Sequence, residues 1–297
     1  MRIFMTGATG FIGSHVAYRL LAAGHELVVA ARNADKLPEL STHPRVRRVT
    51  ATLYDYGVLR EALSGATACV HVALGWGDTP LEMLKTDTTA TVALLEACVE
   101  AGVERFLYTS STAALGAFSR NMNERTPTAP VDYYGATKAA SEAYVLAVAA
   151  RTDMACNVIR PGYTFGNPVV PGATTQPDRR FHQIVARALS GDEIVLRAGD
   201  GTQFVWAGDL ARLYEAVLLS DDDREVYFGL GKPFVTWQSI AERAVVLTGS
   251  RSAVRVEGEP GAPNLFELSK IRKRFGFEFL PEPHLDEHLR YLAEELR

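Results

Sequence analysis

The chain has 297 residues, a formal net charge of -4 and 47% hydrophobic residues, enough apolar material for one large domain or for two lobes. The charge provides no basic field for nucleic acid and no polybasic patch for a membrane, and charged residues interrupt every long apolar segment. Three cysteines stand far apart without metal-ligand spacing and the first predicted strand begins at residue 2, so we expect a cytoplasmic protein without metal or signal peptide.

A glycine-rich turn follows this first strand. Residues 2–6 form a short apolar run, and Gly7, Gly10 and Gly13 lead into a helix predicted at 11–23. Glycines here permit a tight turn, close approach of the backbone to a pyrophosphate, and close packing of helix on strand. The spacing is G-x-x-G-x-x-G, but a strand and a helix flank it as an anion site requires. The segment therefore predicts dinucleotide binding.

Short apolar runs then alternate with helical periodicity. Further strands are predicted at residues 26–31, 45–50, 67–73, 104–110 and 155–159. Strands separated by helices pair in parallel with right-handed crossovers, so the predicted fold is α/β, a doubly wound Rossmann-type parallel sheet. Residues 1–160 are predicted to form the dinucleotide-binding domain. Residues 161–297 are Gly/Pro-interrupted and predict mainly a smaller substrate-binding lobe, with the segment near 200–220 returning to the Rossmann core. Helices are predicted in this part of the chain at 210–219, 237–247 and 285–296.

Tyr134 and Lys138 lie four residues apart on a helix predicted to run to residue 149. The two side chains share one helical face, and a nearby cation stabilises a phenolate. This spacing is also common by chance on helix surfaces. The strand at 104–110 leads into the hydroxyl-rich run 109–112, at the sheet edge where doubly wound proteins bind ligands. These hydroxyls either bind a substrate oxygen or satisfy their own backbone.

In this order, the glycine turn, Ser110-Ser111 with Gly116 after them, and Tyr134-x-x-x-Lys138 resemble an extended short-chain dehydrogenase/reductase. This group contains NAD(P)-dependent epimerases, dehydratases and reductases. The similarity covers almost the whole chain, because 71–73, 160–166 and 204–211 resemble the family's fourth-strand end, its Arg-Pro loop and its Phe-Val…Asp-x-Ala segment.

The resemblance implies a role for each residue of this pattern. Tyr134 is implied as the catalytic acid–base, and Lys138 as the cation that lowers its pKa and binds the nicotinamide ribose. Ser111 is implied to orient the substrate oxygen, with Thr112 beside it. The implied cofactor-binding residues are Gly7, Thr9, Gly10, Phe11, Ile12, Gly13, Arg32, Thr52, Leu53, Ala73, Leu74, Thr109, Tyr134, Lys138 and Pro161. The implied substrate residues are Trp76, Ser111, Thr112 and Tyr163.

The end of the second strand departs from the NAD-using members, which usually carry an aspartate there. This chain has Ala31 followed by Arg32. Losing the carboxylate removes repulsion of a 2′-phosphate, and a guanidinium binds phosphate bidentately. We therefore expect NADP, with NAD less favoured. The alternative interpretation is a solvated arginine after a strand.

Three further departures concern contacts and chemistry. Thr52 replaces the first carboxylate of the family's Asp-Leu-x-Asp stretch, and Asp87 stands where an asparagine often begins the long helix. Ala113-Ala114 follow Thr112 where the dehydratase branch carries Asp-Glu, so 4,6-dehydration is not expected.

Arginines that grip a nucleotide diphosphate are missing from two places. The stretch 199–205 contains none, and 256–261 carries Glu257 and Glu259 where sugar-nucleotide members have an Arg-x-Gly-Asp-like stretch. Arg179 and Arg180 either replace them or form an exposed first helical turn. We expect a carbonyl substrate without a nucleoside diphosphate, since carboxylates repel a diphosphate.

The predicted function is an NADP-dependent oxidoreductase that transfers hydride between the nicotinamide and a carbonyl or secondary alcohol carbon. One alternative is a nucleotide-sugar epimerase, and a second is a non-catalytic NADP-binding interaction protein. The resemblance also implies a homodimer, in which helices at 84–101 and 134–149 form a four-helix bundle across a two-fold axis. The small residues that permit this packing are Ala136, Ala139, Ala140, Ala143 and Ala147.

Overall fold

The structure, a computed structural model, describes residues 1–33 and 36–297. Seven parallel strands form the central sheet in the order β3-β2-β1-β4-β5-β6-β11. They are β1 (Arg2–Thr6), β2 (Glu26–Ala31), β3 (Val46–Thr50), β4 (Ala68–His71), β5 (Arg105–Thr109), β6 (Ala155–Pro161) and β11 (Val226–Gly229). The strand order reverses between β1 and β4, as in doubly wound sheets. The predicted fold class is confirmed.

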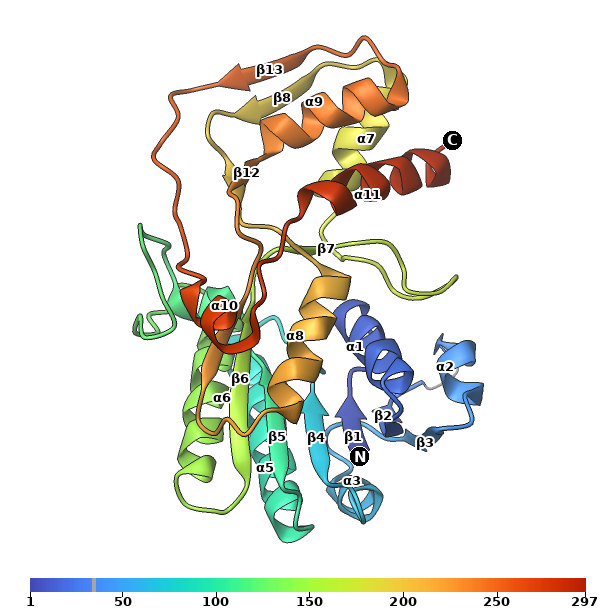
Figure 1. The fold of residues 1–297 in the computed structure, drawn as a ribbon, viewed down its shortest axis with the longest axis vertical. Coiled ribbons are helices and arrows are strands. Elements are labelled where there is room, and N and C mark those ends of the chain that lie inside the picture. Colours follow the sequence, from blue (N-terminus) through green and yellow to red (C-terminus); the bar gives the residue numbers. More distant parts are fainter. Residues whose placement is uncertain (34–35) are drawn as a thin grey trace.

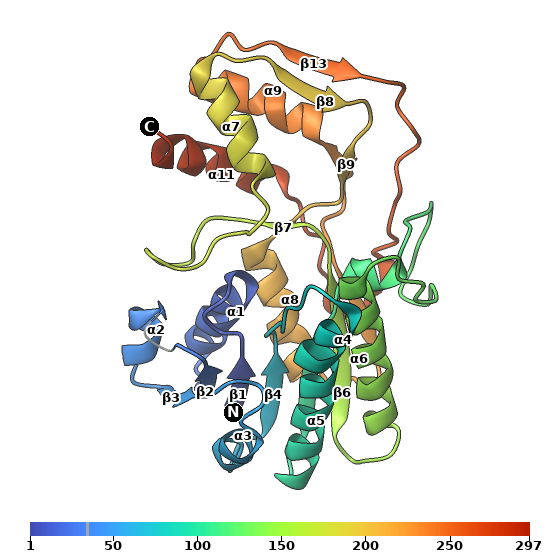
Figure 2. The same ribbon diagram turned by 180° about the vertical axis from the view of Figure 1, so that it is seen from behind.

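Helices cover both faces of this sheet (Figures 1 and 2). One face carries α1 (Phe11–Ala22), α2 (Pro38–Thr42), α8 (Ala207–Leu219) and α10 (Ser269–Phe275). The other carries α3 (Tyr56–Ala62), α5 (Ala90–Glu100) and α6 (Tyr133–Ala149). Strand alternation separates the two cores, because Ile3 and Met5 of β1 pack into the first and Phe4 into the second.

The predicted helix at 84–101 has an irregular start. A short α4 (Pro80–Met83), with a capping box between Thr79 and Glu82, runs into the π-helical segment η2 (Leu84–Thr89) and then into α5. π-Helical turns are rare and often mark functional sites. Asp87 lies within η2 and is fully buried.

A smaller lobe lies beyond the carboxyl ends of the strands (Figures 1 and 2). It contains α7 (Arg180–Ser190), α9 (Trp237–Thr248) and α11 (Glu282–Glu295), with β8 (Ile194–Arg197) paired in parallel to β13 (Val254–Glu257). Its core is rich in aromatic rings, among them Phe165, Phe181, Phe204 and Trp237. Two short strand pairs connect it to the sheet: β7 (Thr164–Phe165) with β10 (Val205–Trp206), and β9 (Gly201–Thr202) with β12 (Val235–Thr236).

The three cysteines are distant in sequence but belong to one buried cluster. Cys69 in β4, Cys98 in α5 and Cys156 in β6 are free thiols in the second core. Burial raises the pKa of Cys156 to about 12, so this thiol stays protonated and unreactive at neutral pH.

Among residues 1–33 and 36–297, none of the helices combines the length and the apolar composition that crossing a bilayer requires.

Candidate active site

The glycine turn brings three backbone segments into close contact. A Cβ on Gly7, where φ is +73°, would lie 2.5 Å from the backbone N of Ala73 after β4. A Cβ on Gly13 would lie 2.0 Å from the Gly7 carbonyl oxygen, so Gly13 packs on the turn itself. Gly10 is the N-cap of α1 and provides no side-chain cap. The first-turn N–H groups are therefore left for another acceptor, which fits a pyrophosphate.

The other predicted cofactor residues lie at the carboxyl ends of the strands. Arg32 is exposed directly after β2. The Thr52 hydroxyl donates to Asp55 Oδ2 at 2.8 Å and the Thr52 amide donates to the same oxygen, and these bonds lower the pKa of Asp55. Thr52 is thus committed to a local turn. The Thr109 hydroxyl accepts a hydrogen bond from Tyr214 of α8 at 2.8 Å. Leu53, Ala73, Leu74 and Pro161 lie at or just after the ends of β3, β4 and β6.

Three residues predicted as catalytic come together at the start of α6. Asp132 caps the helix by accepting from the Gly135 amide at 2.6 Å, and this fixes Tyr134 in the first turn with Lys138 one turn later. Ser111 is the N-cap of the short helix η3 (Thr112–Leu115), and its hydroxyl lies close enough to Tyr134 to oppose a rise in the pKa of the phenol. A Cβ on Gly135 would lie 2.4 Å from the backbone O of residue 113, so glycine is what permits α6 to approach η3.

The electrostatics differ from the expectation that Lys138 lowers the pKa of Tyr134. In the structure burial raises the pKa of Tyr134, as do the charges of Asp87 and Asp132, while the nearby Ser111 hydroxyl opposes the shift. Lys138 Nζ lies 3.5 Å from Asp87 Oδ2, with side chains 3% and 0% exposed. Burial lowers the pKa of Lys138 and Asp87 opposes that shift. The ammonium is therefore paired with a carboxylate that the sequence showed only as a departure from the family pattern.

A chain of hydrogen bonds connects the backbone of Asp87 to the loop after β4. The Ala73 amide donates to Thr6 Oγ1 at 3.3 Å, and Thr6 Oγ1 contacts His71 Nδ1 at 2.6 Å. On the other side His71 Nε2 contacts Thr91 Oγ1 at 3.0 Å, and Thr91 donates to the Asp87 carbonyl at 2.8 Å. Because Thr91 has one proton, His71 must donate from Nε2 and accept at Nδ1. Burial, with the nearby ammonium, lowers the pKa of His71 to about 3, in agreement with this neutral form.

A cavity of about 590 Å³ lies between the sheet edge and the smaller lobe. Three of the predicted substrate residues line it: Ser111 and Thr112 from the catalytic side, and Tyr163 from the lobe. Its other lining residues include Phe118, Asp178, Arg180, Asp200, Phe234, Trp237 and Phe266. Trp76 lies elsewhere, 64% exposed, with its ring centroid 6.4 Å from that of Tyr134.

Of the charges that line this cavity, the sequence pointed to Arg180 but not to Asp178 and Asp200. Arg180 Nη2 pairs with Asp200 Oδ2 at 2.5 Å, and its guanidinium lies 4.4 Å from the Trp237 ring centroid. With Asp178, the lining carries two carboxylates and one guanidinium. Arg179 is exposed. Glu257, expected near a diphosphate position, instead pairs with Arg255 in β13, outside the lining.

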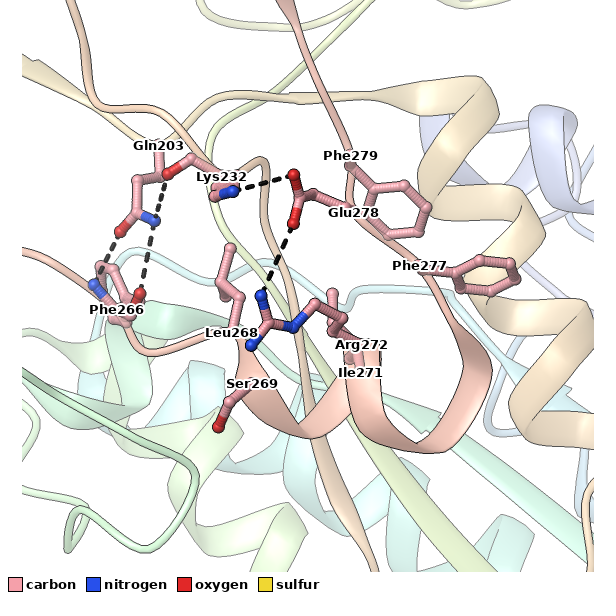
Figure 3. A pocket seen from close by; sticks show the side chains of 10 residues that line it. All are labelled: Gln203, Lys232, Phe266, Leu268, Ser269, Ile271, Arg272, Phe277, Glu278 and Phe279. Atoms are coloured by element: carbon pink, nitrogen blue, oxygen red, sulfur yellow. Dashed lines mark hydrogen bonds and ion pairs between the residues drawn. The ribbon is translucent and has the colours of Figure 1, made fainter.

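A second cavity, of about 180 Å³, shares the residue Phe266 with the first, and contacts in its lining hold that residue in place (Figure 3). Gln203, in the stretch that lacks the family's arginine, accepts from the Phe266 amide at 2.6 Å and donates to the Phe266 carbonyl at 3.3 Å. Glu278 pairs with Lys232 at 2.8 Å and with Arg272 at 3.9 Å. Phe266 lines both cavities, so Gln203 fixes a wall of the larger one.

Comparisons with known proteins agree with this architecture. The model of the NAD dependent epimerase/dehydratase family matches residues 3–228. The chain is 26% identical to the uncharacterized UDP-glucose epimerase YtcB of Bacillus subtilis, over 83% of this chain and 79% of that protein. It is 30% identical to a 3-beta-hydroxysteroid dehydrogenase of Mycolicibacterium neoaurum, over 62% and 52%. The crystal structure of DesIV, a dTDP-glucose 4,6-dehydratase from Streptomyces venezuelae with NAD and TYD bound, is similar with a TM-score of 0.82 and 25% identity, over 100% of both chains.

Proposed function

Because this chain belongs to the NAD dependent epimerase/dehydratase family, we propose that it is an oxidoreductase acting on a carbon that carries a hydroxyl or keto oxygen. The observation that carries the proposal is Tyr134, beside the Ser111 hydroxyl and one helical turn from Lys138, at the carboxyl edge of the sheet. The presence of all three argues against the non-catalytic alternative. A substrate in the adjoining cavity would meet the Ser111 hydroxyl first.

The dinucleotide would be held by the glycine turn and the strand ends. The first-turn amides of α1 would receive its pyrophosphate, and the nicotinamide would supply or accept the hydride. For the cofactor type, the DesIV structure contains NAD, whereas Ala31 and the exposed Arg32 of this chain favour NADP. We keep NADP as the proposed preference.

Tyr134 is proposed to move the proton. In the reducing direction its phenol donates to the substrate oxygen, and Ser111 donates a second hydrogen bond that orients the same oxygen. In the oxidising direction the phenolate accepts the hydroxyl proton. Ala113, which lines the cavity beside Ser111, offers no acid or base, so elimination of water is not proposed.

Replacing Tyr134 by Phe tests this assignment. Tyr134→Phe removes the proton donor but little contact area, so turnover should fall by about 10²–10⁴-fold while the cofactor Kd changes by less than about threefold. Phe118→Leu, a substitution in the cavity wall that keeps the tyrosine, is the control for general damage to the site. Turnover of Tyr134→Phe within a few fold of the parent would place the acid elsewhere.

The comparisons favour the nucleotide-sugar alternative over the predicted simple carbonyl substrate. YtcB and DesIV are named for UDP-glucose and dTDP-glucose. An epimerase would oxidise and re-reduce one sugar carbon without net cofactor turnover. The charge of the cavity supports the simple carbonyl substrate. Arg180 is already paired with Asp200, and Asp178 adds a further carboxylate that would repel a diphosphate. The similarity to a hydroxysteroid dehydrogenase agrees with a substrate that has no nucleotide.

Calorimetric titration of UDP and dTDP into the protein with NADPH separates the two candidates. Micromolar affinity of the parent protein for UDP or dTDP would establish a nucleotide-sugar substrate. Millimolar affinity, with conversion of a ketone or aldehyde, would establish a carbonyl substrate without a nucleotide. In Asp200→Asn the freed Arg180 should strengthen diphosphate binding by up to about tenfold, since one charge-assisted hydrogen bond is regained.

A homodimer remains part of the proposal. Helices α5 and α6 lie side by side (Figure 2), and Ala136, Ala143 and Ala147 are exposed on α6 beside Tyr144. Two such faces would pack as a four-helix bundle. Light scattering at micromolar concentration should give the mass of a dimer, and a monomeric mass would contradict this arrangement.

A further inference from the structure

The carboxylate of Asp87 is placed against Lys138 where no solvent reaches either charge. Asp87 Oδ1 accepts from the Gly75 amide at 3.2 Å. Oδ2 has no hydrogen-bond partner among the described residues and lies 3.5 Å from Lys138 Nζ. A carboxylate buried this completely remains ionised only beside a compensating charge. The two groups therefore form a buried ion pair in which each charge compensates the other.

The fold fixes this carboxylate in position. Asp87 lies in the wide turn of η2, and its carbonyl is the acceptor at the end of the hydrogen-bond chain from His71 through Thr91. A Cβ on Gly75 would lie 1.9 Å from the Thr86 carbonyl, so the loop after β4 is pressed against η2. Asp87 thus has little freedom to turn away from the ammonium.

We propose that Asp87 is a positioning residue that compensates the charge of Lys138 and thereby disfavours the phenolate form of Tyr134. The inference rests on the proposed function, because it takes Tyr134 as the acid–base. Reduction uses the protonated phenol directly. Oxidation, which is also the first half of an epimerisation, needs the phenolate and should become faster as the pH rises.

The buried charges around Tyr134 sum to zero when its phenol is protonated. Lys138 is faced by Asp87 from η2 and by Glu142 from its own helix. Glu142 is held by Arg160 of β6 through bonds of 2.8 and 2.6 Å, so its charge is already compensated. The remaining pair, Lys138 and Asp87, also sums to zero. A phenolate on Tyr134 would therefore be a net buried charge.

The other groups around the phenol do not change this count. Asp132, at the α6 N-cap, raises the pKa of Tyr134 further, and Ser111 is a neutral donor. Tyr108 lies beneath Lys138 with its ring centroid 5.2 Å from Nζ, and Tyr214 faces the phenol from α8; burial raises the pKa of both hydroxyls, so both are neutral. His71 is neutral as described above.

The test is a spectroscopic titration that needs neither substrate nor cofactor. Tyrosinate absorbance is recorded against pH for the parent and for Tyr134→Phe, and the difference isolates one of the 11 tyrosines. The same difference is recorded in an Asp87→Asn background. Asparagine leaves Lys138 uncompensated, so a phenolate then neutralises the cluster, and the midpoint should fall by about one to two pH units. Asp78→Asn, an exposed carboxylate of the same connecting segment, should leave it unchanged.

Two results would overturn the proposal. One is a Tyr134 midpoint in the parent at or below the ordinary tyrosine value, which requires no variant to fold. The other is a midpoint in Asp87→Asn equal to or higher than that of the parent. Retained turnover in Tyr134→Phe would instead overturn the proposed function, so the two failures are distinguishable.

Discussion

Two ion pairs lie near the place where substrate is expected to react, and they differ more in burial than in length. Lys138 and Asp87 are 3.5 Å apart with side chains 3% and 0% exposed, whereas Arg180 and Asp200 are 2.5 Å apart and 35% and 34% exposed. The longer pair is the more consequential, because neither charge can turn to water if its partner is lost. The shorter pair can exchange its partner for solvent or for a ligand. The ion pair of the catalytic centre is therefore fixed before substrate binds, whereas the ion pair of the cavity can rearrange when a ligand binds.

Removing the cation from each ion pair should give the largest difference in stability between the two regions. Lys138→Met leaves Asp87 buried and uncompensated, which should lower the free energy of unfolding by about 3–5 kcal/mol. Arg180→Met leaves Asp200 able to reach water, so the loss should be at most about 1 kcal/mol. Urea denaturation of the two variants and the parent measures both. Equal losses would contradict the contrast between the two regions.

The pairing pattern also indicates what the sequence could reveal. The glycine turn and the Tyr134–Lys138 spacing were visible because each depends on residues close together in the chain. The pairing of Asp200 with Arg180 was not, because these two residues meet only when the smaller lobe folds. Gly135 stood inside the catalytic pattern as a signal that a helix approaches another backbone closely, and its meaning required the position of η3.

The substrate lobe was the less predictable half for the same reason. The helices predicted at 237–247 and 285–296 correspond to α9 and α11, and the first turn of α7 was one interpretation of Arg179 and Arg180, but the β8–β13 pair was not predicted. The loss of an arginine before Phe204 was visible, whereas the replacement role of Gln203, fastening the backbone of Phe266, depends on a contact 63 residues away. Such long-range contacts leave no periodic pattern in one sequence.

Lowering the pH should reduce the free energy of unfolding through the buried residue His71. His71 has a pKa of about 3 in the folded protein and an ordinary value of about 6.5 when unfolded, so the unfolded chain binds the extra proton between these values. Its contribution to stability is complete above pH 6.5 and is lost as pH falls, at about 1.4 kcal/mol per unit. Unfolding free energies measured between pH 7 and pH 5 should show a smaller slope, by about one proton, in His71→Asn. An unchanged slope would mean that His71 is already charged in the folded protein.

An exposed cation acting alone should have the smallest effect. Arg32 follows β2 at the surface, and NADPH is expected to bind at least about tenfold more tightly than NADH, or about 1.4 kcal/mol. Arg32→Ala should remove most of this difference without changing the NADH affinity. Fluorescence titration of both cofactors measures it, with Arg48→Ala, a neighbouring arginine on β3, as the matched control. Equal affinities in the parent would make NAD the preferred cofactor.

Transfer of deuterium from cofactor to substrate tests the central claim most directly. The parent protein is incubated with reduced cofactor deuterated at the transferable position and with two panels of keto compounds, one with nucleoside diphosphates and one without. Mass spectrometry of the products should find one deuterium on the former carbonyl carbon of a compound in one panel. Absence of deuterium from every product of both panels would contradict the assignment of this chain as a nicotinamide-dependent oxidoreductase.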